Sequence, residues 1–177
     1  MNKYLGFMDG SSTVKLSNGP YGPGSVQEWV QSTRGVSILA YSRPERQQMA
    51  VLDYVMANTD RHWDNYLTRP GGEVVAIDHG LAFPEAPDPR AGIRSDFVKA
   101  FHNDKLDDDI MRSVKAVDPR ELRAALEDLQ LSDTAIEGAL ARLAEIRKNG
   151  MITGAEWPDI RRWTRHGPLR ESEIPMR

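Results

Sequence analysis

The chain has 177 residues, enough for one domain with a hydrophobic core and too few for two comfortable ones. Its formal net charge of -3, with 40% hydrophobic and 28% charged residues, is ordinary for a globular protein and lacks the general positive field of a nonspecific nucleic-acid binder. The absence of cysteine excludes disulfides, thiolate nucleophiles and Cys-ligated zinc. With neither a signal-peptide core nor a membrane-spanning run, the sequence predicts a soluble, cytoplasmic protein.

The first thirty residues mix short alternating apolar stretches with turn residues. Residues 4–8 and 13–16 are the apolar stretches, and Gly or Pro occupies positions 19, 20 and 22–24. This pattern predicts strand, turn and linker in a segment too small to be an independent domain.

A helix is predicted to begin at Arg43 and to run into Asn58. Pro44 suits a first helical turn, and Glu45 favours the positive end of the helix dipole. The apolar residues recur at helical spacing at Met49, Leu52, Val55 and Met56.

A short hairpin is predicted next, with strands at residues 66–67 and 74–77 and a glycine turn at 69–72. Residues 81–97 carry Pro84, Pro87 and Pro89 without any hydrophobic period, which predicts an extended surface segment rather than a helix or strand.

The rest of the chain is predicted to be helical. The first of these helices has Asp118 as its N-cap and an apolar stripe of Leu122, Leu126 and Leu129. The second has Ser132 as its cap, Gly150 at its C-terminal end, and a buried side made of Ile136, Leu140, Leu143 and Ile146. The acids at 107–109 suit a solvated helix start, and residues 160–166 a charged, solvated tail.

Two polar loops flank the predicted hairpin. Asp60 and Asn65 stand five positions apart just after the first helix, and Asp78 follows the second hairpin strand. Phosphoryl transfer needs hard oxygen ligands for Mg²⁺ on a triphosphate and a group that orients or deprotonates the attacking hydroxyl. The two loops therefore indicate a metal and phosphate site.

The order of these residues resembles the protein-kinase pattern of Asp-x-x-x-x-Asn, a hairpin and Asp-Phe-Gly, here Asp78-His79-Gly80. Asp60-Arg61-His62-x-x-Asn65 more closely resembles the phosphatidylinositol 3- and 4-kinase family, and HipA-like kinases share parts of it. Residues 22–30 resemble the hinge and following helix of bacterial members, and residues 77–84 resemble their metal loop.

The resemblance implies an α+β, mostly helical kinase-like C-lobe at residues 31–150, an N-lobe remnant and hinge at 1–30, and a C-terminal tail at 151–177. It implies Asp60 and His62 as residues acting on the acceptor hydroxyl, and Asn65 and Asp78 as magnesium ligands. The cofactors would be Mg²⁺ and ATP, and the acceptor a lipid, a protein or a small molecule. A partner chain could supply the rest of the N-lobe, since Lys15 lies too close to Gly24 to be the usual strand lysine.

Each of these residues also has a structural interpretation. Asp60 and Asn65 could cap the loop, His62 could be a hydrogen-bonded structural histidine, and Arg61 could pair with a nearby carboxylate. His79 is expected to pack or hydrogen-bond. The aromatic residues expected to pack rather than to stack on a ligand are Trp29, Trp63 and Phe83.

Two alternative functions stay open. The first is a catalytically inactive pseudokinase or interaction module that keeps the loops but lacks most of the N-lobe. The second is a metal-dependent phosphohydrolase, whose ligands would be Asp60, His62, Asp78 and His79. His102 and His166 lie outside both loops, so the histidines that a hydrolase needs are few.

Overall fold

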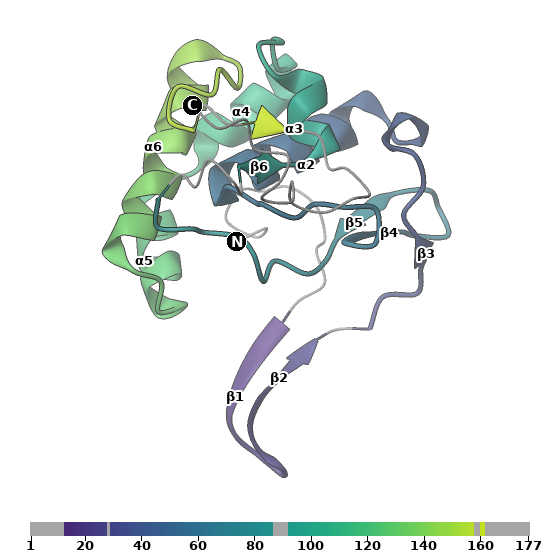
Figure 1. Cartoon of the computed structure of the whole chain (residues 1–177), viewed down its shortest axis with the longest axis vertical. Coiled ribbons are helices and arrows are strands. Elements are labelled where there is room, and N and C mark those ends of the chain that lie inside the picture. The colour runs from purple at the N-terminus through teal and green to yellow at the C-terminus, as the bar shows by residue number, and fades with distance from the viewer. Residues whose placement is uncertain (1–12, 28, 87–91, 158–159, 162–177) are drawn as a thin grey trace, which may run out of the picture.

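The computed structural model describes residues 13–27, 29–86, 92–157 and 160–161 (Figure 1). The helices in these ranges are the short 3-10 helix η1 (Ile38–Ala40), α2 (Arg43–Met56), α3 (Asp96–Phe101), α4 (Asp108–Ala116), α5 (Pro119–Asp128) and α6 (Asp133–Asn149). The strands are β1 (Thr13–Gly19), β2 (Gly22–Gln27), β3 (Thr33–Arg34), β4 (Tyr66–Thr68), β5 (Val74–Ala76), β6 (Ile93–Arg94) and β7 (Ile160–Arg161). This mixture of helices and small sheets is compatible with the predicted α+β class.

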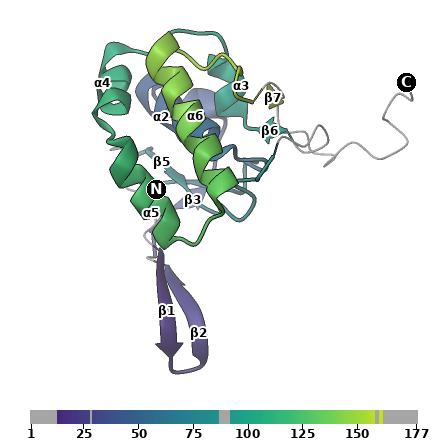
Figure 2. The ribbon, with the colours of Figure 1, turned by 90° about the vertical axis from the view of Figure 1, so that its left-hand side faces the viewer.

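The described strands form three small sheets. β1 and β2 make an antiparallel hairpin, which projects away from the helices (Figures 1 and 2). β3, β4 and β5 form an antiparallel sheet in that order, so the hairpin predicted around residues 69–72 is confirmed as β4 and β5. β6 and β7 pair in parallel and bring residues 93–94 next to residues 160–161.

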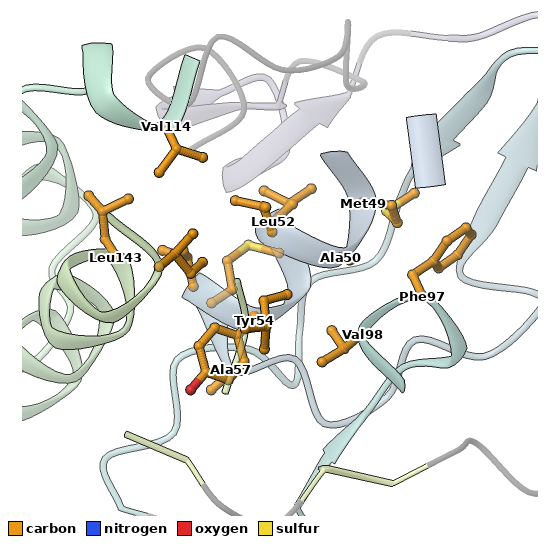
Figure 3. Close-up of a cluster of buried hydrophobic side chains, with 14 of the residues drawn as sticks. Met49, Ala50, Leu52, Tyr54, Ala57, Phe97, Val98, Val114 and Leu143 are labelled. Atoms are coloured by element: carbon orange, nitrogen blue, oxygen red, sulfur yellow. The ribbon is translucent and has the colours of Figure 1, made fainter. Parts of the chain in front are cut away.

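Helix α2 lies at the centre of the fold. Ser42 and Glu45 form a capping box at its start, and Ala57 ends it in the left-handed conformation with a φ of 48°. Its residues 49–56 are all buried, because α3 packs on one side of it and α4 and α6 pack on the other. Figure 3 shows Phe97 of α3 and Leu143 of α6 on opposite sides of this helix. The predicted helix over 43–58 is thus confirmed to within two residues.

Two predictions for loop segments are wrong. The predicted helix after residue 24 is absent, since residues 22–27 form β2 and residues 29–32 lie outside helices and strands. Pro23 and Gly24 disfavour a helix, and pairing with β1 satisfies the backbone instead.

The segment 81–97 was predicted to hold no element, yet β6 and the start of α3 lie in it. Residues 87–91, with two of its prolines, lie outside the described residues. Ser95 caps α3 by accepting a hydrogen bond from the Val98 N–H, and Ile93 and Phe97 are completely buried. The Ser95 cap and the short apolar run could be seen in the sequence, but the prolines before them favoured the prediction of an extended segment.

The C-terminal helices agree with the sequence, with a few exceptions. Ser132 caps α6 and Gly150 ends it with a φ of 69°, as predicted. Leu129 is 58% exposed, because α5 already ends at Asp128. Trp29, predicted to pack, is 91% exposed, and Ile160, predicted to be solvated, is buried. Residues 4–8 and 162–166 lie outside the described residues.

Residues 151–157 are tied to the helices by the buried carboxylate of Glu145. One oxygen accepts hydrogen bonds from the Thr153 and Gly154 N–H groups, at 2.8 and 3.0 Å. The other accepts from the Tyr54 hydroxyl at 2.5 Å and from the Glu156 N–H at 3.0 Å. Burial opposes ionisation of Glu145, but the hydrogen bonds from Thr153, Tyr54 and Glu156 outweigh it and lower the pKa of this carboxyl.

We predict that Glu145→Gln destabilises the fold by about 1–3 kcal/mol at neutral pH, because its amide NH₂ would face the Tyr54 or Glu156 donors. Since the folded-state pKa of Glu145 lies below its ordinary value of 4.5, its stabilisation is present above that value and is lost as pH falls through the folded-state pKa. The variant should therefore show a weaker acid dependence of the melting temperature than the wild type. Exposed Glu121→Gln is the control, and equal acid dependence in Glu145→Gln and the wild type would contradict the prediction.

Candidate functional site

The first polar loop, residues 58–65, is called the DRH loop and is anchored to the end of α2. The Asn58 N–H donates to the Asp53 carbonyl at 2.8 Å, and the Asn58 side-chain amide donates to the Asp53 carboxylate at 3.2 Å. The Asn58 side-chain oxygen accepts the Asp60 N–H at 3.0 Å. Asp60 is therefore positioned by Asn58, which is itself hydrogen-bonded to Asp53 of the central helix.

Three of the predicted site residues meet in the DRH loop. The Asn65 side-chain amide donates to the Asp60 carbonyl at 2.7 Å and lies 3.4 Å from its carboxylate. His62 Nδ1 accepts the Asp64 N–H at 3.1 Å, which leaves the proton on Nε2, 3.6 Å from Asp60 Oδ2. Asp60 and His62 are thus partly enclosed neighbours, with side chains 34% and 22% exposed.

The second polar loop, residues 77–84, is called the DHG loop and begins where β5 ends. The Ile77 N–H donates to the Asn65 carbonyl at 3.1 Å, which continues the β4–β5 pairing by one step. Asp78 follows immediately, is exposed, and adopts a left-handed φ of 49° with its Oδ1 accepting the Gly80 N–H at 3.2 Å. The hairpin therefore brings Asn65 and Asp78, the two predicted metal ligands, to the same edge.

Arg61 connects the DRH loop with the DHG loop. Its side chain is completely buried and pairs with buried Asp53, with Nη2 2.9 Å from Asp53 Oδ1. Its Nη1 donates to the Asn65 carbonyl at 2.5 Å and to the Ile77 carbonyl at 2.6 Å. The expectation that Arg61 pairs with a nearby carboxylate is confirmed.

His79 completes the same cluster. Its Nδ1 lies 3.0 Å from Arg61 Nη2, and because a guanidinium can only donate, Nδ1 must accept. Burial, and next the charge of Arg61, lower the pKa of His79 to about 4. His79 is therefore neutral at neutral pH, with its proton on Nε2, and the expectation that it hydrogen-bonds is confirmed.

The DHG loop also lies along the end of α2. The Phe83 N–H donates to the Met56 carbonyl at 2.7 Å, and the Thr59 hydroxyl donates to the Leu81 carbonyl at 2.9 Å. Phe83 packs against the core, as expected. Trp63 stays partly exposed, with the Arg34 guanidinium 5.3 Å from its ring centre.

The donor set of the two loops fits magnesium. The Asn65 amide nitrogen is engaged with Asp60, so only the amide oxygen of this largely buried side chain could bind a cation, and Asp78 has Oδ2 beside its hydrogen-bonded Oδ1. Mg²⁺ is usually bound through one or two such oxygen ligands together with substrate phosphates. Across the ranges that the structure describes, no three His, Asp or Glu side chains gather for a metal, so the phosphohydrolase alternative finds no ligand cluster there.

Sequence reasoning missed three residues of this site. Asp53 stands inside the apolar run 51–55, where a carboxylate is unusual, and that position was the available signal. Ser95 donates to Asp53 Oδ2 at 2.7 Å, and nothing local in the sequence linked it to the loops. Asn58 was predicted only as the end of the first helix, with no role in the site.

A family model of kinases matches the segment that carries both loops. The model is described as phosphatidylinositol 3- and 4-kinase and covers residues 25–103, from within β2 to just beyond α3. The chain is therefore phosphatidylinositol 3- and 4-kinase-like over this segment, and the resemblance inferred from the DRH motif is confirmed. The resemblance to HipA-like kinases stays a prediction.

The match suggests a kinase C-lobe-like fold, phosphotransferase activity in general, and a nucleotide with Mg²⁺ as the cofactors typical of the family. No curated protein matches the chain. Among the described residues, no helix is both long enough and apolar enough to cross a membrane.

We predict that Asp53→Ala destabilises the fold by about 3–5 kcal/mol, because it leaves the Arg61 charge buried and unpaired. Urea denaturation followed by circular dichroism measures the change. The matched control is Asp109→Ala, which removes an exposed carboxylate paired with Arg112 and should cost no more than about 1 kcal/mol. Equal losses in the two variants would show that the buried pair contributes no more than a surface pair.

Proposed function

We propose that this chain transfers the terminal phosphate of a Mg²⁺-bound nucleoside triphosphate to a hydroxyl group of a lipid, protein or small molecule. One observation carries the proposal. The Ile77 N–H to Asn65 carbonyl hydrogen bond brings the DRH loop, with Asp60 and Asn65, beside the DHG loop, with Asp78. The family match over both loops supports the same activity.

Asp60 is the residue proposed to receive the acceptor's proton. About a third of its side chain is exposed, so a hydroxyl can reach its carboxylate. The His62 Nε2–H faces Asp60 Oδ2 and would help to hold the carboxylate in position for the acceptor. The acceptor oxygen then bonds to the γ-phosphorus, the bond to the bridging oxygen breaks, the proton passes to Asp60, and nucleoside diphosphate leaves.

Asn65 and Asp78 are the proposed holders of magnesium, which when bound supplies positive charge against the phosphate oxygens. The hydrogen bond from the Asn65 amide to the Asp60 carbonyl would orient the amide oxygen in advance. The Gly80 N–H does the same for one oxygen of Asp78. Such prior orientation lowers the ordering cost of binding the nucleotide.

The alternative function is a pseudokinase or interaction module that binds without transferring phosphate. One observation bears on it: residues 13–27, most of which precede the segment that the kinase family model matches, pair as the hairpin β1–β2, whereas an active kinase covers its nucleotide with a glycine-rich loop and a strand lysine. Lys15 lies in β1 opposite Ser25, and its side chain is outside the described part of the structure. A partner chain could supply these parts.

We predict that Asp78→Ala weakens Mg²⁺-dependent ATP binding at least about tenfold, about 1.4 kcal/mol, because one of two metal ligands is lost. Calorimetry on the wild type and the variant measures binding, and Asp109→Ala is the control for losing an exposed carboxylate. Unchanged affinity in Asp78→Ala would remove Asp78 from the metal site.

We predict that Asp60→Asn lowers kcat by about 10²–10⁴-fold while leaving Mg²⁺-ATP affinity nearly unchanged, because only the proton acceptor is lost. A labelled-phosphate assay that includes autophosphorylation measures transfer. A folded wild type that binds Mg²⁺-ATP but transfers nothing would favour the pseudokinase. One that does not bind at all would refute an active phosphotransferase in this chain alone.

A further inference from the structure

We infer that Arg61 is the positioning residue that sets the spacing between the DRH loop and the DHG loop. The inference rests on the proposed function for its catalytic consequence, but the contacts that carry it are independent of any ligand. Arg61 itself is buried and cannot touch a substrate. It would act through Asn65 and Asp78.

All three guanidinium nitrogens of Arg61 make contacts. A guanidinium carries five N–H groups in a fixed plane. Nε donates to the Asp53 carboxylate at 3.0 Å, and Nη2 lies 2.9 Å from the same carboxylate in the ion pair. Nη1 donates to two backbone carbonyls, and Nη2 donates to His79 Nδ1.

The two carbonyls bound by Nη1 belong to the residues that matter for spacing. One is the carbonyl of Asn65, and the other is that of Ile77, the residue before Asp78. One nitrogen of the planar guanidinium, Nη1, therefore binds the backbones of both loops, at 2.5 and 2.6 Å. Together with the Ile77 N–H to Asn65 carbonyl bond, this contact fixes the separation between the proposed metal ligands.

Arg61 is itself held in place by residues outside the two loops. Asp53 receives Arg61 on its carboxylate and also the Ser95 hydroxyl at 2.7 Å, and all three residues are buried. The backbone N–H of Arg61 donates to the Arg94 carbonyl at 2.9 Å, so β6 and the start of α3 support the DRH loop. The guanidinium has little freedom to rotate away from the two carbonyls.

Lysine cannot replace this arrangement. Its ammonium is a point charge with three donors on a flexible stem, so it can keep the Asp53 pair only by giving up some of the other contacts. Arg61→Lys therefore tests spacing while retaining the buried charge. Arg142→Lys is a matched control, since Arg142 is equally buried, binds the Val55 carbonyl and stacks on Trp157 outside both loops.

The first readout is amide hydrogen exchange at Ile77, measured by NMR on the full chain. Its N–H is protected by the Asn65 carbonyl. In Arg61→Lys this amide should exchange at least about tenfold faster than the change in global stability requires, whereas in Arg142→Lys it should follow global stability. The second readout is the Mg²⁺ concentration for half-maximal phosphate transfer, which should rise about tenfold in Arg61→Lys alone.

His79 offers a second test if Arg61→Lys fails to fold. His79→Leu removes the acceptor for Nη2 while leaving the ion pair intact, and His79→Asn restores a side-chain acceptor. His79→Leu should reproduce both effects of Arg61→Lys, and His79→Asn should reverse them at least in part. Equal behaviour of the two His79 variants would overturn the inference.

The outcomes separate the inference from the proposed function. If the wild type transfers phosphate, unchanged Mg²⁺ dependence in a folded Arg61→Lys variant overturns the positioning role, even where its melting temperature falls as in Arg142→Lys. If the wild type neither binds nor transfers, the proposed function fails. Ile77 exchange then decides the inference alone, with faster exchange in Arg61→Lys supporting the spacing role and unchanged exchange refuting it.

Discussion

The buried ion pair between Arg61 and Asp53 is the interaction on which the rest of the site depends. Both side chains are fully enclosed, so each charge would be costly without the other. The pair joins the central helix α2 to the DRH loop, and the remaining Arg61 donors reach the backbones of both loops. The fold thus uses one desolvated cation to organise the partly exposed Asp60 carboxylate, the exposed Asp78 carboxylate and the largely buried Asn65 carboxamide.

The core explains how α2 can carry this pair. The helix is enclosed by α3, α4 and α6 (Figure 3). Its second half is bound to α6 by two contacts: the Tyr54 hydroxyl donates to Glu145, which also holds residues 151–157, and Arg142 donates to the Val55 carbonyl. A helix held from several sides keeps its C-terminal end fixed, and the DRH loop leaves from that end. The stability of the core and the geometry of the site therefore share the same few residues.

The local parts of this architecture were predictable from sequence because their signals are local. Capping residues and apolar spacing predicted α2 and α6, and the order Asp60, Asn65, hairpin and Asp78 predicted which loops would meet. The parts that failed depend on distant partners: Ser95 reaches Asp53 across the fold, and β6 exists because β7 pairs with it. The helix predicted after residue 24 is absent because residues 22–27 pair with β1, a partner that the resemblance to a kinase hinge did not include.

The most direct test of this account is a crystal structure of the full chain with Mg²⁺ and a non-hydrolysable ATP analogue. The account predicts a magnesium ion bound by the side-chain oxygens of Asn65 and Asp78, at about 2.0–2.1 Å. It also predicts that Arg61 keeps its contacts to the Asn65 and Ile77 carbonyls. A nucleotide bound away from the two loops, or a metal held by other residues, would contradict it.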